Sequence, residues 1–226
     1  MRALWILPLL VATSAHADDT FEAKAATAQR LGRVDGLVWA LTARCDAGDN
    51  TEQRQCRQVR DRRAAELAGA TLLVEADRDA FSVGAWNPKK KSVPLSLSGC
   101  IRCSGLELDG TTYYVVAAKP GTPLHVKAGK LDAGLVYDNA RPLGDENAAK
   151  VFVKAAGNTR VQMLVRVPAK PTTTVGGKPV IALDLVGYRV IAACDGSIVA
   201  SSPPSGPAAP DKKQCAPSAA VAPPHK

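Results

Sequence analysis

Residues 92–118, SVPLSLSGCIRCSGLELDGTTYYVVAA, contain the clearest strand pattern in the chain. Apolar residues alternate with serines at its start, which predicts a half-buried strand, and Pro94 favours a place at a sheet edge. Further on, Asp109 and Gly110 supply the positive φ angles of a type I′ turn between two apolar segments. The second of these segments, 111–117, is β-branched and aromatic and predicts the returning strand. The stretch therefore predicts a strand followed by a β-hairpin.

A CxxC motif, Cys100-Ile-Arg-Cys103, lies between the first strand and the hairpin. In an extended strand, Cα atoms three residues apart are separated by roughly 10 Å, whereas a disulfide requires them within about 7 Å. Cys100 and Cys103 can therefore pair only where the chain turns. Gly99 and Gly105 flank the motif and would permit that turn. We expect a tight turn closed by a local disulfide.

Two helices are predicted upstream, at residues 18–44 and 51–68, because apolar residues recur there with helical spacing. Two glycines weaken the centre of the first helix. Residues 46–50 are typical of a turn, and Asn50 or Thr51 would cap the second helix. The segment therefore predicts a helical hairpin. The residues expected to face inward on its second helix are Cys56, Val59, Ala64 and Leu67.

One cysteine lies on each arm of this hairpin, Cys45 at the end of the first helix and Cys56 in the second turn of the next. Closing their loop of about 11 residues would stabilise the fold by roughly 3 kcal/mol in the chain-entropy model, against about 2 kcal/mol for Cys100–Cys103. We predict both bonds, the first as a structural staple and the second as a local bridge. A crossed pattern, which would join the hairpin to the sheet, is the alternative.

The remaining chain is mostly β-structure. Strands are predicted at 71–76, 81–86, 124–127, 131–137, 160–167, 180–193 and 198–200. Asp145 and Gly157 delimit one short helix, and residues 170–179 are expected to form a loop. A Pro/Gly break at 119–123 is a candidate subdomain boundary. The predicted fold is α+β, an N-terminal helical hairpin packed on mainly antiparallel β-sheet with a β-rich second half, in a single domain at residues 18–200.

Both ends of the chain differ from this domain. Residues 1–17 have the pattern of a signal peptide: Arg2, an apolar run too short to span a membrane, and the A-x-A site that ends at Ala17. Residues 201–226 contain seven prolines among alanine and serine, which cannot bury a core and predict a disordered tail. We therefore expect an exported protein, periplasmic or extracellular, whose mature chain has no integral membrane segment. The absence of an Asn-x-Ser/Thr acceptor favours a bacterial source.

Six cysteines in an exported chain are typical of a set of disulfides. Cys45–Cys56 and Cys100–Cys103 leave Cys194 and Cys215 as the residual pair. Because Cys215 lies in the predicted tail, it could also bond another chain or stay free.

The chain is basic, with 29 Lys and Arg against 21 Asp and Glu. One of the basic residues lies in the signal segment, so the mature chain has a formal charge of +7. A basic helix face and a basic loop could contact an anionic surface such as lipid head groups or wall polymers. A solvated face with i,i+4 ion pairs is the simpler interpretation. The residues concerned are Arg54, Arg57, Arg60, Arg62, Arg63, Lys89, Lys90 and Lys91. Aromatic residues do not interleave with them, so we expect no nucleic-acid partner.

Few residues offer catalytic chemistry. His125 is the only histidine outside the signal segment and the tail, and neither a G-x-S-x-G elbow nor a phosphate-binding loop occurs. Glu75, Asp77 and Asp79 alternate, but they lack the EF-hand pattern and are interpreted as a solvated turn. No catalytic residue, metal ligand or cofactor is assigned.

The CxxC motif could serve thiol–disulfide exchange or form half of a metal site. Exchange enzymes lower the pKa of the first thiol at a helix N-terminus, whereas the residues after Cys103 predict a strand. A structural disulfide is therefore the favoured interpretation. We expect a non-catalytic exported protein, a binding or accessory module of the cell envelope whose partner the sequence does not identify. The alternative is a thiol–disulfide or metal-dependent protein that uses Cys100 and Cys103.

Three segments, LVWALTARC at 37–45, TEQRQCRQVRDRRA at 51–64 and SGCIRCSG at 98–105, resemble small exported proteins of myxobacteria that have no assigned function. The resemblance covers residues 20–200. It implies export, and it brings no catalytic residues.

Overall fold

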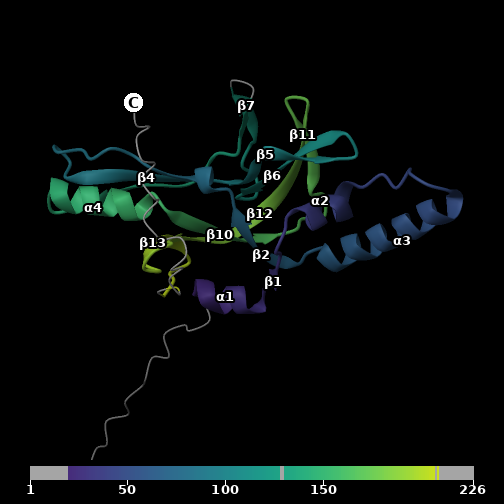
Figure 1. Cartoon of the computed structure of the whole chain (residues 1–226), viewed down its shortest axis with the longest axis horizontal. Helices are drawn as coiled ribbons and strands as arrows, with labels where there is room; N and C mark the ends of the chain where they lie inside the picture. Colours follow the sequence, from purple (N-terminus) through teal and green to yellow (C-terminus); the bar gives the residue numbers. More distant parts are fainter. Residues whose placement is uncertain (1–19, 128–129, 207, 209–226) are drawn as a thin grey trace, which may run out of the picture.

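The computed structural model describes residues 20–127, 130–206 and 208 (Figure 1). The helices are α1 (Phe21–Thr27), α2 (Asp35–Thr42), α3 (Asn50–Leu67) and α4 (Glu146–Ala156), with a 3₁₀ turn η2 (Arg78–Ala80). The strands are β1 (Gln29–Arg30), β2 (Thr71–Ala76), β3 (Phe81–Val83), β4 (Ser92–Ser98), β5 (Cys100–Leu108), β6 (Thr111–Ala118), β7 (His125–Lys127), β8 (Lys130–Asp132), β9 (Leu135–Pro142), β10 (Thr159–Arg166), β11 (Thr172–Val175), β12 (Lys178–Ala192) and β13 (Ile198–Ser202). The fold is α+β with mainly antiparallel strands, which confirms the predicted fold class.

The expected signal peptide, residues 1–17, lies outside the described residues. Within the described part of the chain, no helix combines the length and apolar character needed to cross a membrane.

Strand β12 organises the larger sheet, whose strand order is β1-β2-β10-β12-β6-β5. The beginning of β12 pairs with β11 and, in parallel, with β6, while its end pairs with β10 and β13. Gly187 allows β13 to approach closely, because a Cβ atom there would lie 2.7 Å from the Ser202 carbonyl oxygen. One long strand therefore connects two groups of neighbours.

A smaller sheet, β3-β4-β9, packs over one face of the larger one. Leu95 and Leu97 of β4 share a buried cluster with Val115 of β6 and Ile181 of β12, and each is at most 1 % exposed. Strand β4 continues into β5 through Gly99, where a Cβ atom would lie 1.9 Å from the Ala117 carbonyl oxygen. The stretch that dominates the sequence pattern thus crosses from one sheet to the other.

Pro94 does not place its strand at an edge, and this prediction is wrong: β4 lies between β3 and β9. The ring is tolerated because β3 ends at Val83, opposite Leu95. One residue further, the Gly84 amide donates to the Pro94 carbonyl oxygen at 2.8 Å. The missing amide hydrogen of proline therefore falls where the β3–β4 pairing stops.

The single helix predicted for residues 18–44 is also wrong, because this segment forms α1, β1 and α2. Strand β1 pairs in parallel with β2, and the Leu31 amide donates to the Leu73 carbonyl oxygen at 3.0 Å. Gly32 follows directly, and glycine costs about 1 kcal/mol relative to alanine inside a helix. The pairing of the edge strand β1 with β2 therefore takes the place of the middle of the predicted helix.

Helix α3 forms where predicted, but Asp49 caps it instead of Asn50 or Thr51. Asp49 Oδ1 accepts from the Thr51 and Glu52 amides, and Glu52 Oε2 accepts from the Asp49 amide. This reciprocal pair is a capping box. At the other end Gly69 has a φ of 72°, a conformation that glycine adopts readily.

The inward face expected on α3 is largely wrong. Of the four residues named for it, Leu67 is buried, whereas Val59 is 41 % exposed. The helix packs chiefly against α2, and it extends away from the sheets at one end of the molecule (Figure 1). In contrast, Leu37 and Val38 of α2 are fully buried in the main core. The helical hairpin therefore packs on the sheet through α2, and α3 is an exposed arm.

Helix α1 covers the opposite face of the larger sheet (Figure 1). Phe21 packs with Leu73 and Leu164 in a separate buried cluster, while Met163 and Val165 belong to the main core. Successive strand residues point to opposite faces, so β10 contributes to both layers.

The tail boundary predicted at residue 201 lies too early. Strand β13 runs to Ser202 and pairs with β12. The Pro204 carbonyl oxygen accepts from the Phe21 amide at 3.0 Å, so the chain beyond β13 packs along α1. The residues from 209 onward lie outside the described part.

Most other elements follow the prediction. Asp109 and Gly110 have φ angles of 50° and 70°, as a type I′ turn requires, and α4 is capped by Asp145 and ends before Gly157. The predicted loop at 170–179 instead contains β11, whose β-branched residues pair with β12.

Candidate functional site

The Cys45–Cys56 disulfide joins the chain after α2 to the second turn of α3, with a Cα–Cα distance of 5.6 Å. An Arg60 guanidinium nitrogen also donates to the Ala43 carbonyl oxygen at 2.9 Å. These links attach the exposed arm to the buried helix. The bond is the one expected from the sequence.

The Cys100–Cys103 disulfide also forms, again with a Cα–Cα distance of 5.6 Å. The turn predicted between two strands is wrong, however, because the motif lies inside the continuous strand β5. The register against β6 shifts on both sides of Arg102, which marks β-bulges at the motif. Bulging brings the cysteines together without ending the strand. Cys100 is 6 % exposed.

Cys194 lies exposed in the turn after β12 and forms no disulfide with the described residues. Its expected partner, Cys215, lies outside them, so that pair stays a prediction. Among the residues described, no three His, Cys, Asp or Glu side chains group as a metal site would require.

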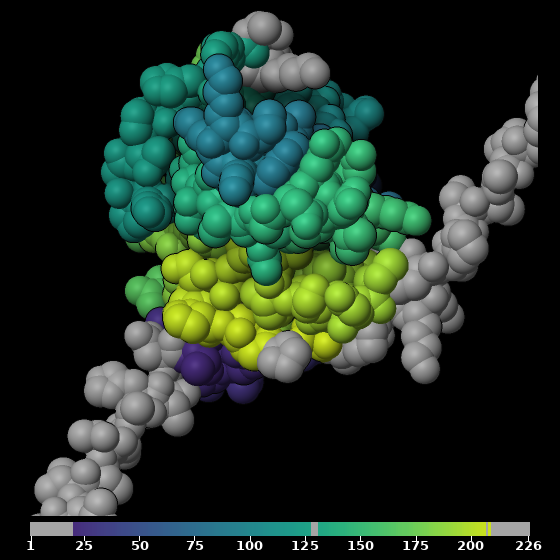
Figure 2. All heavy atoms as spheres, turned by 90° about the vertical axis from the view of Figure 1, so that its left-hand side faces the viewer, coloured from purple at the N-terminus to yellow at the C-terminus, as the bar shows by residue number. Residues whose placement is uncertain are grey.

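The basic residues named from the sequence do not form one patch. Five arginines lie on α3, at one end of the longest axis of the molecule (Figure 1). Lys91 accepts a backbone hydrogen bond from Leu143, which directly precedes the α4 region. Figure 2 faces this other end, where the blue segment before β4 lies beside green α4. Lys89, Lys90 and Lys91 are thus remote from the arginines.

The arginines of α3 mostly bind within their own helix. Arg54 and Arg57 donate through Nε to backbone carbonyls one turn earlier. Arg62 and Arg63 lie 4.0 and 3.7 Å from Glu66, and these three side chains are more than half exposed. Exposed pairs of this kind contribute about 0–1 kcal/mol each. The geometry resembles a solvated helix face.

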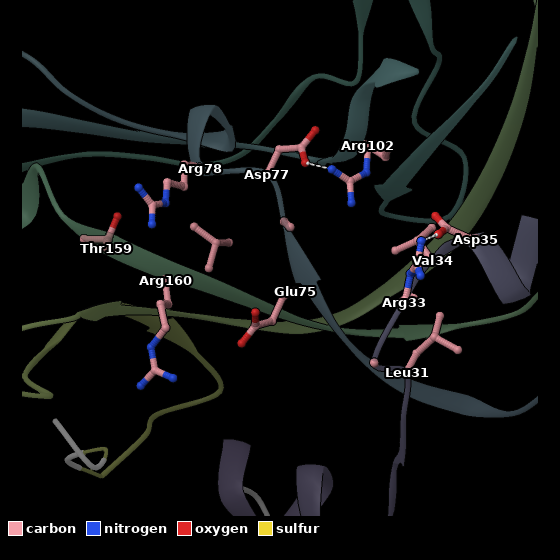
Figure 3. A pocket seen from close by; sticks show the side chains of 13 residues that line it. Leu31, Arg33, Val34, Asp35, Glu75, Asp77, Arg78, Arg102, Thr159 and Arg160 are labelled. Carbon is pink, nitrogen blue, oxygen red and sulfur yellow. Dashed lines mark hydrogen bonds and ion pairs between the residues drawn. The ribbon is translucent and has the colours of Figure 1, made fainter. Parts of the chain in front are cut away.

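A different charged site appears where four distant segments meet. Its cleft, of about 470 Å³, lies between the loop before α2, the end of β2 with the η2 turn, β5 and the start of β10 (Figure 3). Each segment contributes one arginine: Arg33, Arg78, Arg102 and Arg160. The carboxylates of the cleft are Asp35, Glu75 and Asp77, so its formal charge is +1.

Asp77 and Arg102 form the best-sheltered ion pair of the cleft. Their oxygen and nitrogen atoms lie 2.8 Å apart, and the side chains are 17 % and 40 % exposed. Ser104 Oγ lies 3.5 Å from the other Asp77 carboxylate oxygen. The Asp77 amide donates to the Ile101 carbonyl oxygen at 3.0 Å. Asp77 is therefore held through both backbone and side chain, which corrects its interpretation as part of a solvated turn.

The other arginines differ in their partners. Arg33 bonds Asp35 beside α2. The Arg78 backbone carbonyl accepts from the Phe81 amide. The Arg78 side chain is exposed and makes no hydrogen bond or ion pair with the described residues, and Figure 3 shows it on the same side of the cleft as Arg160. Glu75 extends into the space between them and Arg33 (Figure 3). A guanidinium group without a protein partner remains available for an oxyanion.

Sequence reasoning missed this cleft. Its arginines are separated by dozens of residues and share no local motif. The available signals were partial: Arg102 lies inside the CxxC motif, and Glu75 and Asp77 belong to the alternating carboxylates interpreted as a solvated turn.

The two cysteines of the motif line another cavity, of about 770 Å³. Tyr114, Lys127 and Asp132 also border this cavity. Arg102 contributes to the charged cleft instead. The bulged segment of β5 therefore borders two separate spaces.

Comparisons with protein-family models, with curated proteins and with solved structures each gave no match to this chain.

Proposed function

We propose that this chain is an exported, non-catalytic binding protein that holds an anionic group, a carboxylate or a phosphate, in the charged cleft. The observation that carries the proposal is the convergence of four arginines from four separate segments on one space. A guanidinium group binds carboxylate and phosphate oxygens in a planar, bidentate manner, so such a cluster is suited to oxyanions.

The lining of the cleft favours binding over catalysis. Its described residues offer arginines, carboxylates and Thr159, and they include no histidine, cysteine, serine or lysine. Asp77 and Asp35 are each paired with an arginine. A carboxylate oxygen that already accepts from a guanidinium group is less available to take a proton from a substrate.

The proposal includes export to the periplasm or the extracellular space, where disulfides persist. Both disulfides of the described chain support such a compartment. The partner that carries the anionic group would then be a solute or a component of the envelope.

A thiol–disulfide activity at Cys100 and Cys103 is the second candidate, because both cysteines line a cavity. Against it, Cys100 is 6 % exposed, and the residues that follow Cys103 continue as strand. No helix N-terminus is available there to lower a thiol pKa. A reduction potential below about −300 mV would favour a structural bond, and a higher one an exchange function.

Titration calorimetry with inorganic phosphate and with succinate tests the binding function. We expect Arg78→Gln and Arg102→Gln to weaken binding of the preferred anion by about tenfold or more each, as charge-assisted hydrogen bonds contribute about 1.5–3 kcal/mol. Arg62→Gln on α3 removes the same charge at a residue that does not line the cleft and is the matched control. It is expected to leave the affinity within about twofold at an ionic strength of about 0.15 M.

Equal weakening by Arg62→Gln and Arg102→Gln would mean that net charge, and not the cleft, governs binding. That result, or no binding of either anion by the wild-type protein, would contradict the proposal.

A further inference from the structure

We infer that the Cys100–Cys103 disulfide positions Arg102 in the charged cleft, so that this bond determines the affinity for the anion and is not merely a staple. The inference rests on the proposed function. It concerns a bond that, in the chain-entropy model, stabilises less than a long-loop disulfide such as Cys45–Cys56.

The bond contracts β5 at the position of Arg102. Three residues of extended strand span about 10 Å, whereas the Cα atoms of Cys100 and Cys103 are 5.6 Å apart. In the register, Cys100 lies opposite Val116 and Leu106 opposite Tyr113. Six residue steps on β5 therefore face three on β6, and the surplus residues are held in bulges. Arg102 lies between these register shifts.

The contracted segment is attached to the cleft by three contacts. The Ile101 carbonyl oxygen accepts from the Asp77 amide at 3.0 Å, and Ile101 itself is 1 % exposed. An Arg102 guanidinium nitrogen lies 2.8 Å from Asp77 Oδ1, and Ser104 Oγ lies 3.5 Å from Oδ2. Ile101 and Arg102, within the disulfide loop, and Ser104, directly after it, thus all contact Asp77.

This geometry depends on the bulge. If residues 100–103 lengthened towards a regular strand, successive side chains would alternate between the sheet faces. Ile101 and Arg102 could then no longer keep both their contacts with Asp77. The disulfide prevents that lengthening, while the cysteines themselves line the other cavity. In this proposal Arg102 contacts the anion, and the Cys100–Cys103 disulfide affects the affinity only by positioning Arg102.

A double-mutant cycle in phosphate affinity tests this role. Cys100→Ser/Cys103→Ser is expected to weaken phosphate binding by about five- to tenfold, a typical size for coupled residues. In an Arg102→Gln background, the same double substitution is expected to change the affinity by less than about twofold. In an Arg33→Gln background, the weakening should be as large as in the wild-type protein, because Arg33 lies on the loop before α2 and pairs with Asp35, not with Asp77 or β5.

Cys45→Ser/Cys56→Ser is the matched control, since it removes the other disulfide. We expect it to lower the thermal midpoint and leave phosphate affinity unchanged. If the variant that lacks the Cys100–Cys103 bond does not fold, the Cys45→Ser/Cys56→Ser protein, with Cys194 and Cys215 also replaced by serine, can be reduced at Cys100–Cys103 and compared with its oxidised form.

Amide hydrogen exchange supplies a readout that needs no ligand. Loss of the bridge is expected to speed exchange of the Asp77 amide, which bonds Ile101, while amides in the β10–β12 pairing keep their protection. Unchanged exchange at Asp77 would overturn the positioning role. Equal phosphate affinity with and without the bridge would overturn it too, with the proposed function intact. If wild-type protein binds no phosphate or succinate, the proposed function fails, and exchange at Asp77 alone decides the positioning.

Discussion

The two disulfides fasten regions that differ sharply in burial. Cys45–Cys56 holds α3, a helix whose only buried residue is Leu67. Cys100–Cys103 lies in β5, beside Ile101 and next to a sheet core whose central residues are at most 1 % exposed. Because α3 buries so little apolar surface, the first bond is the main attachment of this helix. The second adds little to packing that already exists, and instead determines the local path of the strand.

Apolar burial should therefore dominate stability in the sheets and not in the arm. Ile181→Ala in β12 removes a side chain that is fully buried, and we expect a loss of about 2–5 kcal/mol in the free energy of unfolding. Val59→Ala, at a position 41 % exposed on α3, is expected to cost less than about 0.5 kcal/mol. Urea denaturation measures both. A comparable loss of unfolding free energy for Ile181→Ala and Val59→Ala would contradict the exposed position of Val59 on α3.

The arm should depend on its covalent link. Cys45→Ser/Cys56→Ser is expected to cost about 3 kcal/mol, the entropy that an 11-residue loop removes from the unfolded chain. The hydrogen-exchange rate of the α3 amides should rise more than that of the β12 amides. Without the disulfide, α3 would be attached to α2 only by non-covalent contacts such as the Arg60–Ala43 hydrogen bond. Exchange rising equally in α3 and β12 would contradict the view that the bond acts locally.

The contact between the two ends of the described chain is a smaller, polar attachment. Glu22 of α1 accepts from Ser205, from the Gly206 amide at 3.1 Å and from Arg189 at 2.8 Å. Burial by itself raises the pKa of Glu22, but the hydrogen bonds from Ser205 and Gly206 and the charge of Arg189 together lower the pKa below its ordinary value. The ionised form is thus the one that the folded protein stabilises.

Acid should weaken this attachment. Because the pKa of Glu22 is lower in the folded state than its unfolded value near 4.3, the stabilisation is complete above that value and is lost as the pH falls through the folded pKa. We expect Glu22→Gln to cost less than about 1 kcal/mol at neutral pH, since the side chain is 43 % exposed. Urea denaturation at a pH of about 7 and about 3 should show this difference shrinking in acid. A difference that persists at the lower pH would show that charge on Glu22 is not involved.

Several elements follow from local sequence alone. The φ angles of Asp109 and Gly110, the cap at Asp145 and the end of α4 depend on residues next to one another, and each was predictable for that reason. The distance limit on a CxxC disulfide likewise required the chain to contract at Cys100–Cys103. These features involve residues that are close in the chain, so local conformational preference and side-chain chemistry suffice to predict them.

Tertiary contacts decided the rest. Backbone pairing of β1 with β2 interrupts a segment with helical periodicity, and the sheet accommodates the CxxC contraction as bulges where a turn was expected. The charged cleft depends on Arg33, Arg78, Arg102 and Arg160, whose separation along the chain leaves no local pattern. Hydrophobic periodicity indicates which face of an element is apolar, but it does not specify which other segment covers that face, as the exposed Val59 of α3 illustrates. The site therefore exists only through the way the sheets bring distant segments together.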